Sequence, residues 1–545
     1  MSTLDLPTAR TSDRVKTPVP DRADVTIIGA GLGGLMAGAL LAKQGHKVAI
    51  FDQHYVAGGC ATMYHRVSKG DHYQFDIGLH YVGDCQPGGR LPMLLEQAGV
   101  QVEFLPMDMD GFDTIVLPGL TFPITAGHDA YRDRLVEFFP AEVKGIDRYV
   151  RLLKEVDVLG AEINRERRGL SATAGLLWTA ATKARLVPRY QNATMAQVLD
   201  DCTQDPALRA VILGQSGDYG LPASRVSAML HMGLANHYFK GAWYPKGGGQ
   251  VIADRLCEVI ETHGGVICLR RTVEKILVLD GKACGVQVRG MRQESQKVLS
   301  QQVLSNADIR RTLLELLPEK HLPPEQWKRA QNFQMGGAIF LSCFGIKGDL
   351  AKLGMGPRNY WCFDSLDGEE IYSDIAKGKL DPRAVYITSA SLKDPDTHGH
   401  TPEGVMGVEV MCLSPGRAEA WGVSQEQVFS GAYRDNAEYL AHKQRVEDAL
   451  LDRLEAQFPG CKERVVFRES ATPVTHTRFT RATDGTGYGL AATPDQFMKG
   501  RPGYRGPIPG LFMAGANTRS GHGIVGALSS GRAAAFRMQQ ELKGR

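Results

Sequence analysis

The sequence predicts an α/β protein in which a nucleotide-binding domain built on a parallel sheet carries an inserted lobe of mixed α+β structure. Three observations predict this fold. A strand, closely spaced glycines and a helix follow one another near the start of the chain, a second strand, glycine loop and helix stand near its end, and a long region of helices and then strands separates them. At 545 residues the chain also exceeds what one compact core usually supports.

The first element is the segment ADVTIIGAGLGG, residues 23–34. We expect a strand at Val25–Ile28, a helix at Leu32–Gln44 and a second strand at Lys47–Phe51, which leads directly into the acidic Asp52. Strand, glycines, helix and acid in this order form the dinucleotide fingerprint of a Rossmann-like domain.

Each glycine of this fingerprint has a physical role. Gly29 permits the tight turn, Gly31 lets the backbone approach a pyrophosphate, and Gly34 lets the helix and the strand pack closely. The N-terminus of the helix offers unpaired N–H groups to the phosphates, and Asp52 accepts hydrogen bonds from a ribose. The start of the chain therefore predicts a bound dinucleotide.

The region after the fingerprint passes through the inserted lobe and returns. A second glycine pair, Gly58-Gly59, follows the second strand, and from Leu91 to Phe239 we expect mostly helices. The segment YPKGGGQV then re-enters the nucleotide-binding domain. It is followed by a helix and by a hairpin that pairs Val273–Val278 with Cys284–Val288 across Asp280-Gly281.

Alternating apolar residues predict that strands return later in the inserted lobe. The expected strands are Ala338–Phe344, Ala384–Ser389 and Val405–Met411. An amphipathic helix is expected at Asp435–Phe458, and it ends before Pro459-Gly460. The last segment, GLFMAGANTRSGHGIVGALSSGRAAAFRMQQEL, again predicts a strand, a glycine loop and a helix.

These elements predict a discontinuous domain organisation. A flexible leader is expected at residues 1–22. The nucleotide-binding domain is expected at 23–90, 240–320 and 470–545, and the substrate-binding lobe at 91–239 and 321–469.

Composition and motifs exclude several functional classes. The net charge is only +3 and no long basic run is present, so a nucleic-acid partner is not expected. The ten cysteines contain no C-x-x-C spacing, which is typical of reduced thiols in the cytoplasm. No apolar run reaches the roughly 18 residues that span a bilayer. The sequence has neither a nucleophile elbow nor a metal-ligand spacing, so no metal is expected.

Four separated elements together resemble the superfamily of flavin-dependent oxidoreductases that contains phytoene desaturases, carotenoid isomerases and retinol saturases and is related to the amine oxidases. They are the fingerprint with Asp52, the Gly58-Gly59 turn, the YPKGGGQ segment with its hairpin, and the loop and helix after Gly515. The stretches HYFKGAWYPKGG and FDIGLHYVG are most similar to the retinol saturase and carotenoid isomerase branch. The resemblance extends over residues 23–535.

The resemblance implies an FAD molecule that both ends of the chain bind in an extended pose. The fingerprint would hold the ADP half, Gly58-Gly59 would pass the pyrophosphate and ribityl chain, and the backbone of Val273 would meet the adenine. The loop Gly515–Gly526 would lie beside the flavin ring, where the N-terminus of the following helix favours negative charge on the reduced ring. The implied cofactor-binding residues are Gly29, Gly31, Gly34, Asp52, Gly58, Gly59, Val273, Gly515, Asn517, Gly523 and Ile524.

Two residues depart from the pattern of the wider group. Many of its flavoenzymes carry an acid directly after the glycine of the last strand, where this chain has Ala516. The ribityl contact is then left to the backbone or to Asn517, a pattern that resembles the desaturases more than the amine oxidases. Asp52 stands where Glu is more usual, and its shorter side chain reaches a ribose if the strand ends closer to it.

Few titratable residues stand near the flavin that the resemblance implies. His522 and Arg519 lie in the loop expected over the ring, and we take them as candidate catalytic residues, His522 for proton transfer and Arg519 for stabilising an anionic flavin. A structural role and a functional role both stay open for them. The other polar candidates are His80, His237, Lys246 and Cys60.

The resemblance implies an FAD-dependent oxidoreductase that acts on carbon–carbon bonds of a hydrophobic polyene or isoprenoid. Desaturation, saturation and isomerisation stay open, as does the electron donor or acceptor. One alternative is a flavin amine oxidase, which predicts an acid after Gly515 and an aromatic cage. The other is a non-catalytic carrier of prenylated proteins of the GDP-dissociation-inhibitor type. A second glycine fingerprint is missing, so a separate NADPH domain is not expected.

A basic amphipathic segment raises the question of membrane contact. Residues 164–190 combine six basic residues with one acidic residue, a local charge of +5, and carry Leu176, Leu177 and Trp178. Such a segment is typical either of a helix that rests on an anionic membrane or of a solvated helix packed on the inserted lobe. The expected location is the cytoplasm, with peripheral membrane contact as the alternative.

Overall fold

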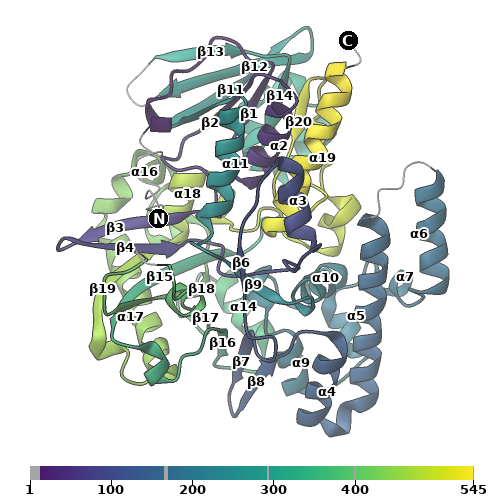
Figure 1. Ribbon diagram of the computed structural model, residues 1–545, viewed down its shortest axis with the longest axis vertical. Helices are drawn as coiled ribbons and strands as arrows, with labels where there is room; N and C mark the ends of the chain where they lie inside the picture. The colour runs from purple at the N-terminus through teal and green to yellow at the C-terminus, as the bar shows by residue number, and fades with distance from the viewer. Residues whose placement is uncertain (1–12, 165–169, 291–293, 398–399, 544–545) are drawn as a thin grey trace.

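Figure 1 shows the computed structural model of the protein, which describes residues 13–164, 170–290, 294–397 and 400–543. Two sheets organise the chain. A parallel sheet lies in the upper half of the view and a larger mixed sheet in the lower left, with a group of helices at the lower right. Each sheet is assembled from segments that are far apart in the sequence.

The parallel sheet has five strands in the order β10-β2-β1-β14-β20, and every neighbouring pair runs parallel. They are β1 (Val25–Ile28), β2 (Val48–Asp52), β10 (Val266–Leu269), β14 (Gln302–Ser305) and β20 (Leu511–Met513). The first strand lies where the sequence predicts it, the second is shifted by one residue, and helix α2 (Leu32–Ala42) joins them. The predicted Rossmann-like fold is confirmed.

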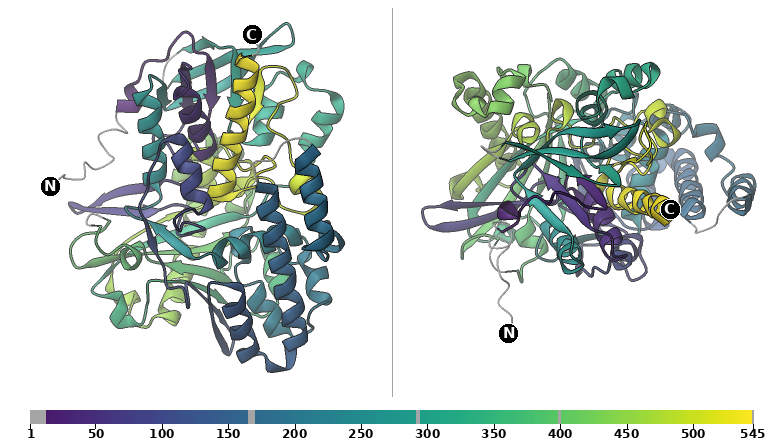
Figure 2. Two further views of the ribbon diagram at one scale, coloured as in Figure 1. Left: turned by 45° about the vertical axis from the view of Figure 1, so that its right-hand side comes forward. Right: turned by 90° about the horizontal axis from the view of Figure 1, so that it is seen from above.

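Both faces of this sheet are covered. Successive residues of its strands point to opposite sides, so each face packs against a different layer. Val25 and Ile27 share a core with α2, α11 (Gln250–Thr262) and α19 (Gly523–Lys543). Ile28 packs on the other side, against the three-stranded sheet β11-β12-β13. Figure 2 shows α19, in yellow, beside α2, in dark purple.

The three-stranded sheet contains the predicted hairpin. Its strands are β11 (Arg271–Leu279), β12 (Lys282–Gly290) and β13 (Ser295–Leu299). β11 and β12 pair antiparallel across a turn in which Asp280 and Gly281 have φ of 49° and 73°, as a two-residue hairpin requires. The sequence did not predict β13, because Val298 is its only buried residue and leaves little apolar signal.

The larger sheet has seven strands in the order β19-β15-β18-β17-β16-β7-β8, and all neighbours are antiparallel except β16 and β7. They are β7 (Asp113–Leu117), β8 (Leu120–Ile124), β15 (Ala338–Lys347), β16 (Asn359–Phe363), β17 (Ala384–Thr388), β18 (Val405–Ser414) and β19 (Val465–Ala471). The three strands expected from alternating apolar residues are confirmed as β15, β17 and β18.

The expectation of mostly helical structure from Leu91 to Phe239 is wrong for its first part. Helix α3 (Arg90–Ala98) lies at its start, but β6 (Phe104–Pro106), β7 and β8 follow before the next helix, and β7 and β8 form a hairpin with Gly119 at φ of 76° in the turn. These strands are only 3 to 5 residues long. A periodicity judged over longer windows does not detect them.

The helices of the inserted lobe form the right-hand side of Figure 1. They are α4 (His128–Phe138), α5 (Val143–Asn164), α6 (Leu170–Thr182), α7 (Val187–Tyr190), α8 (Met195–Asp200), α9 (Pro206–Ile212) and α10 (Ala228–Phe239). Other elements are α3 (Arg90–Ala98), α13 (Pro324–Gln331), α14 (Gly368–Ala376), α15 (Ala390–Lys393), α16 (Gln425–Ser430), α17 (Ala437–Gln457), α18 (Pro473–Thr480), β3 (Met63–Ser68), β4 (Asp71–Asp76), β5 (Val82–Gly83) and β9 (Ala242–Pro245). The predicted amphipathic helix is α17, and the side chain of Asn436 caps it by accepting from the amide of Tyr439 at 2.9 Å.

The expected flexible leader is too long. Residues 1–12 lie outside the described part of the chain, but Arg14 is buried and its guanidinium contacts the carboxylate of Glu261 on α11 at 2.7 Å. Arg22 forms a parallel β-bridge with Leu299 at the edge of the three-stranded sheet. Two hydrogen bonds from the buried Arg14 to the exposed Glu261 fix this segment to α11.

The two ends of the chain meet where α2 and α19 cross. A Cβ atom on Gly531 would lie 2.2 Å from the carbonyl oxygen of Gly33. The helices therefore touch backbone to backbone, which only glycine permits. This contact places the loop before α19 next to the fingerprint glycines.

Candidate active site

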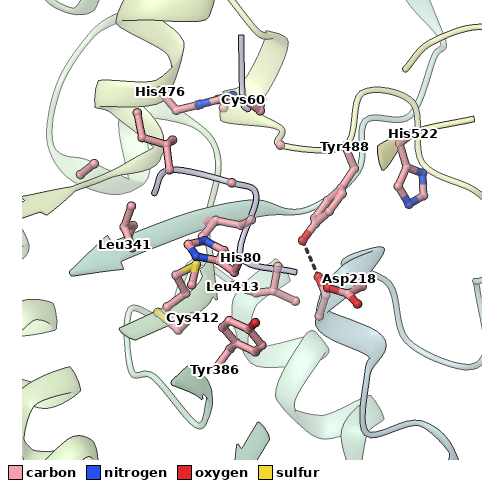
Figure 3. Close-up of a pocket in the computed structure, with 18 of the residues that line it drawn as sticks. Cys60, His80, Asp218, Leu341, Tyr386, Cys412, Leu413, His476, Tyr488 and His522 are labelled. Atoms are coloured by element: carbon pink, nitrogen blue, oxygen red, sulfur yellow. Dashed lines mark hydrogen bonds between the residues drawn. The ribbon is translucent and has the colours of Figure 1, made fainter. Parts of the chain in front are cut away.

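A cavity of about 820 Å³ lies where the two sheets face each other. Its wall contains the turn at Gly59 and Cys60, the start of α19, Leu341 and Tyr386 of the larger sheet, and Leu234 of α10. Figure 3 shows Cys60, Leu341 and Tyr386, from three of these segments, around one space. Its size and its many aliphatic and aromatic side chains are typical of a site for an organic ligand.

The larger sheet forms the floor of this cavity. In β15 the side chain of Leu341 faces the cavity, whereas Phe340 and Phe344 pack on the opposite face in the core with α17. Tyr386 of β17 packs on Trp361 of β16 with ring centroids 4.4 Å apart, and both line the cavity. The floor is therefore mostly apolar and includes packed aromatic rings.

The two glycine turns of the nucleotide-binding domain lie against each other. Gly31 and Gly58 form a parallel bridge, and the amide of Gly58 donates to the carbonyl of Ala30 at 2.8 Å. A Cβ atom on Gly34 would lie 2.3 Å from the carbonyl oxygen of Gly29, which has a φ of 94°. These contacts agree with the roles predicted for the glycines, a tight turn and close packing of helix and loop.

Asp52 lies beneath this loop. Its carboxylate accepts hydrogen bonds from the backbone amides of Ala30 at 2.7 Å and His54 at 2.8 Å. Burial raises the pKa of Asp52, and these two hydrogen bonds oppose the shift. Asp52 thus fixes the glycine loop, and its oxygens keep further lone pairs for a ribose.

Asn306 is a site residue that the sequence reasoning missed. Its Nδ2 atom lies 3.5 Å from the carbonyl oxygen of Gly29, and its Oδ1 atom would lie 2.5 Å from a Cβ atom on Gly33. Among the described residues this buried Oδ1 atom has no hydrogen-bond partner. A signal was available, because Asn306 directly follows β14 at the carboxyl edge of a parallel sheet, where ligands bind in such folds.

The loop Gly515–Gly526 folds behind and beside the cavity. Gly515 has a φ of 89°, and its amide donates to the hydroxyl of Ser530 at 2.7 Å. The Oδ1 atom of Asn517 accepts from the amide of Leu490 at 2.9 Å, so this side chain holds a neighbouring segment. Gly523 and Ile524 line the cavity at the start of α19.

The structure does not bring Arg519 to the cavity. Its side chain is exposed, and the residue is absent from the lining formed by the described residues. Lys246 is likewise outside that lining and pairs with Glu103 at 3.1 Å. Val273 lies in β11 at a register shift, on the side of the parallel sheet away from α2.

His80, His237 and His522 all line the cavity. Burial lowers the pKa of His80 and His522 to about 3 and that of His237 to about 4, so all three imidazoles are neutral near pH 7. The Nε2 atom of His237 accepts from the amide of Gly83 at 2.8 Å, which gives it a structural role. His522 is therefore a neutral hydrogen-bonding group near pH 7.

Cys60 faces the cavity at the glycine turn, as Figure 3 shows. Burial raises the pKa of its thiol to about 11, so it is protonated at neutral pH. All ten cysteines are free, in agreement with the expected reduced thiols.

A group of buried acids and tyrosines was not predicted. The carboxylate of Asp113 on β7 accepts from Asn359 Nδ2 at 2.8 Å, Gln215 Nε2 at 2.6 Å, Trp361 Nε1 at 3.2 Å and the hydroxyl of Tyr81 at 3.0 Å. The same hydroxyl lies 2.8 Å from Asp218 Oδ2. Asp218 lines the cavity and Asp113 does not.

A second buried charge cluster supports the loop at His80. The Nζ atom of Lys393 donates to the carbonyl of His80 at 2.5 Å and to the hydroxyl of Thr388 at 2.6 Å. Burial lowers the pKa of Lys393 to about 8 and raises that of Glu409 to about 8, and each charge opposes the other's shift. These groups lie behind the cavity wall and stabilise its shape.

The described residues contain neither a cluster of metal ligands nor a membrane-spanning helix. Within residues 13–543, apart from the gaps given above, His, Cys, Asp and Glu form no group of three or more that would hold a metal ion. No helix in the same residues is both long enough and apolar enough to cross a membrane.

Comparison with known proteins agrees with this geometry. Residues 27–98 match the family model for the NAD(P)-binding Rossmann-like domain, and residues 389–539 match that for the flavin-containing amine oxidoreductases. All-trans-retinol 13,14-reductase of Danio rerio is 29% identical over 533 residues, which cover 94% of this chain and 85% of that protein. Prolycopene isomerase 1 of an Oncidium hybrid cultivar is 25% identical over 544 residues, 97% of this chain and 86% of that protein.

Over almost its whole length the chain is similar to retinol reductases and carotenoid isomerases, and its two ends match families of nucleotide-binding and flavin-containing proteins. Its fold is shared more widely. Wild-type putrescine oxidase superposes with a TM-score of 0.60 at 16% identity, over 95% of this chain and 99% of that chain.

The residues of this site fit the flavin of the superfamily. Gly31 leaves space between two turns that a Cβ atom would fill, because that atom would lie 2.9 Å from Asn306 Nδ2. The first turns of α2 and α19 carry no acidic side chain, so their N–H groups are available to an anionic group. The unpaired Asn306 Oδ1 gives a further polar contact.

Proposed function

We propose that this protein is an FAD-dependent oxidoreductase that acts on carbon–carbon double bonds of a hydrophobic polyene or isoprenoid. The observation that carries the proposal is the junction of an apolar cavity with two glycine loops from opposite ends of the chain. The names of the relatives, a retinol reductase and a carotenoid isomerase, support the same substrate class.

FAD would lie along the carboxyl edge of the parallel sheet. The fingerprint glycines and the N-terminus of α2 would face its pyrophosphate, Asp52 its ribose, and the backbone of Val273 its adenine. Gly58 and Gly59 would lie beside its ribityl chain. Gly515, Asn517, Gly523 and Ile524 would lie beside the ring, which reaches into the cavity at the start of α19.

The bound flavin supplies two-electron exchange with the substrate. The protein supplies the surroundings in which that exchange takes place. The helix dipole at Gly523 favours negative charge near the ring, and neutral His522 offers a hydrogen bond without adding a positive charge. Leu234, Leu341 and Tyr386 exclude water from an apolar chain in the cavity.

Purification and product analysis test this proposal. We expect yellow protein that releases FAD, and anaerobic incubation with a panel of retinoids and carotenoids should yield a saturated, desaturated or isomerised product. Colourless protein that does not bind added FAD would contradict the cofactor. Flavin-loaded protein that converts no member of the panel would contradict the substrate class.

A flavin amine oxidase is the second candidate, because residues 389–539 match the flavin-containing amine oxidoreductases. The acid expected after the glycine of the last strand is Ala516 here, which argues against it. The aromatic criterion does not separate the two functions, because Tyr386, Trp361 and Tyr488 line the cavity. Peroxide release in proportion to added amine, without conversion of polyenes, would favour the oxidase. Co-purification with a small GTPase and without flavin would favour the carrier alternative.

Helix α6 is a proposed contact with a membrane surface. Leu177 and Trp178 are 65% and 58% exposed, and Lys183 lies 5.2 Å from the centre of the Trp178 ring. Exposed apolar side chains with basic neighbours are suited to an anionic lipid surface. An apolar substrate would be extracted from that surface. The predicted bases Arg165, Arg167 and Arg168 lie outside the described residues. Flotation with anionic vesicles should fall for Leu177→Asp, whereas unchanged flotation would contradict the contact.

A further inference from the structure

Asp218 occupies an unusual position at the cavity. It is the last residue of the short 3-10 helix Ser216–Asp218, and its carboxyl group lies in the group of acids and tyrosines around Tyr81. The rings of Tyr81 and Tyr238 stack with centroids 4.3 Å apart and an angle of 2°. The two phenols form a fixed platform next to the acid.

The hydrogen bonds around Tyr81 require one more proton than the tyrosine provides. Its hydroxyl lies within hydrogen-bond distance of Asp113 Oδ2, at 3.0 Å, and of Asp218 Oδ2, at 2.8 Å. A phenol has one proton and donates to one acceptor at a time. If both carboxyl groups were ionised, two oxygen atoms would face each other without a proton between them.

The extra proton belongs on Asp218. Burial raises the pKa of Asp113, but three donors besides Tyr81 oppose this shift and satisfy an ionised carboxylate. Asp218 is paired with Tyr81 and Tyr238 only and faces the cavity. A protonated Asp218 donates to Tyr81, and Tyr81 then donates to Asp113. This chain of donors leaves no pair of oxygens unbridged.

Three side chains from different segments fix the backbone at Asp218. Tyr372 of α14 donates to the carbonyl of Ser216 at 3.0 Å, and Tyr488 donates to that of Gly217 at 2.5 Å, the bond drawn in Figure 3. The imidazole of His522, in the loop beside the flavin, bonds to the backbone of Asp218. The acid is thereby tied to the loop that borders the cofactor position.

The electrostatic surroundings agree with a protonated acid. Burial and the charge of Asp113 raise the pKa of Asp218 to about 7, and hydrogen bonds from Tyr81 and Tyr238 oppose this shift. The other titratable groups that face Asp218 are Tyr219, Tyr372, Tyr386 and Tyr488. Lys393 lies on the far side of Asp113 and interacts with that carboxylate.

We propose that Asp218 is the proton donor of this active site and that Tyr81 and Asp113 are its positioning residues, an assignment that rests on the proposed function. In a reduction, the π electrons of the substrate double bond form a C–H bond with the Asp218 proton. The other hydrogen and two electrons come from the reduced flavin, and Asp218 remains as a carboxylate that solvent reprotonates. In an isomerisation, the same proton is added and removed with no net electron transfer. Three readouts test it.

The first readout does not depend on turnover. Infrared titration of protein labelled with ¹³C-aspartate should show a protonated carboxyl band that disappears with a midpoint near pH 7 in wild type. The band should be missing in Asp218→Asn and unchanged in Asp71→Asn, which alters an exposed acid of β4. An Asp218 that is already ionised at pH 5 overturns the proposal, whether or not the protein binds flavin.

The second readout uses the flavin-loaded protein. Asp218→Asn should bind flavin as wild type does but convert substrate about 100- to 10,000-fold more slowly, as expected for loss of a general acid. Asp218→Glu should restore part of the rate. In deuterated water, wild type should place one solvent deuterium on the new C–H bond. A substituted protein within about threefold of the wild-type rate, under the same general-acid expectation, overturns the assignment.

The third readout separates positioning from packing. Tyr81→Phe removes the hydroxyl and keeps the stacked ring, so flavin binding and KM should change little while the alkaline limb of the kcat profile, near pH 7, moves. A purely structural role for Tyr81 would lower stability and leave the pH profile in place. If wild type binds flavin and converts no polyene, the proposed function fails, and the infrared titration still decides the protonation of Asp218.

Discussion

Replacing Gly34 by alanine tests whether the fingerprint is built by close packing. The new methyl carbon would lie 2.3 Å from the carbonyl oxygen of Gly29, about 1 Å less than the 3.4 Å at which ordinary contact begins. Such overpacking costs about 1–3 kcal/mol, whereas alanine is favoured over glycine in a helix by about 1 kcal/mol. The net loss of stability is therefore up to about 2 kcal/mol.

The same substitution should weaken flavin binding. Relief of the contact moves α2 away from the loop, and a loss of only about 1.4 kcal/mol in binding is a tenfold change in affinity. The assay is fluorescence titration of the apoprotein with FAD, together with thermal unfolding. Gly160→Ala in α5 is the matched control, because no atom lies within 4 Å of its Cβ position. It should gain stability by about 0.5–1 kcal/mol. A Gly34→Ala protein that binds FAD as tightly as wild type and melts no lower would refute the packing argument.

Three other predictions concern titratable groups around the cavity. Cys60 faces the cavity and its thiol has a pKa of about 11, so alkylation at alkaline pH should modify it in the apoprotein. The alkylation rate should fall at least about tenfold when flavin is bound. Equal rates with and without flavin would show that the cofactor does not cover Cys60. Burial raises the pKa of Glu409 to about 8, so the folded state keeps a proton that the unfolded chain has lost above its ordinary value of 4.5. Stability should therefore fall from pH 5 to pH 8 by up to about 1.4 kcal/mol per pH unit, and Glu409→Gln should flatten this slope in urea unfolding, whereas an unchanged slope would assign it elsewhere. His522 has a pKa of about 3, so His522→Gln should keep the shape of the pH–rate profile; loss of a limb near pH 6.5 would identify the imidazole as the acid.

The sequence predicted the nucleotide-binding half of the site well because that half depends on local geometry. The turn at Gly29 needs a positive φ, and the contact between Gly34 and Gly29 spans five residues, so both are recorded in one short motif. Asp52 follows its strand directly. Short motifs of this kind are readable without knowledge of distant contacts.

The acids of the cavity could not be predicted in this way. Tyr81 is separated from Asp113 by 32 residues and from Asp218 by 137 residues, and β7, which carries Asp113, was itself not predicted. Asn306 was missed for a related reason, since its contacts are with Gly29, Gly31 and Gly33, far earlier in the chain. Arg519 shows the reverse case, because a suitable position in the sequence did not bring its side chain to the cavity.

The contacts that fix Asp218 join segments that lie far apart in the sequence. Tyr372 lies in α14, whereas Tyr488 and His522 lie between α18 and α19. A Cβ atom on Gly217 would lie 2.3 Å from the Trp361 ring, so the backbone there has no room to shift alone. Movement of one of these segments relative to the others would therefore break hydrogen bonds at Ser216–Asp218 and displace Asp218 from the loop Gly515–Gly526. Because of this coupling, the position of the acid depends on the loop that borders the cofactor.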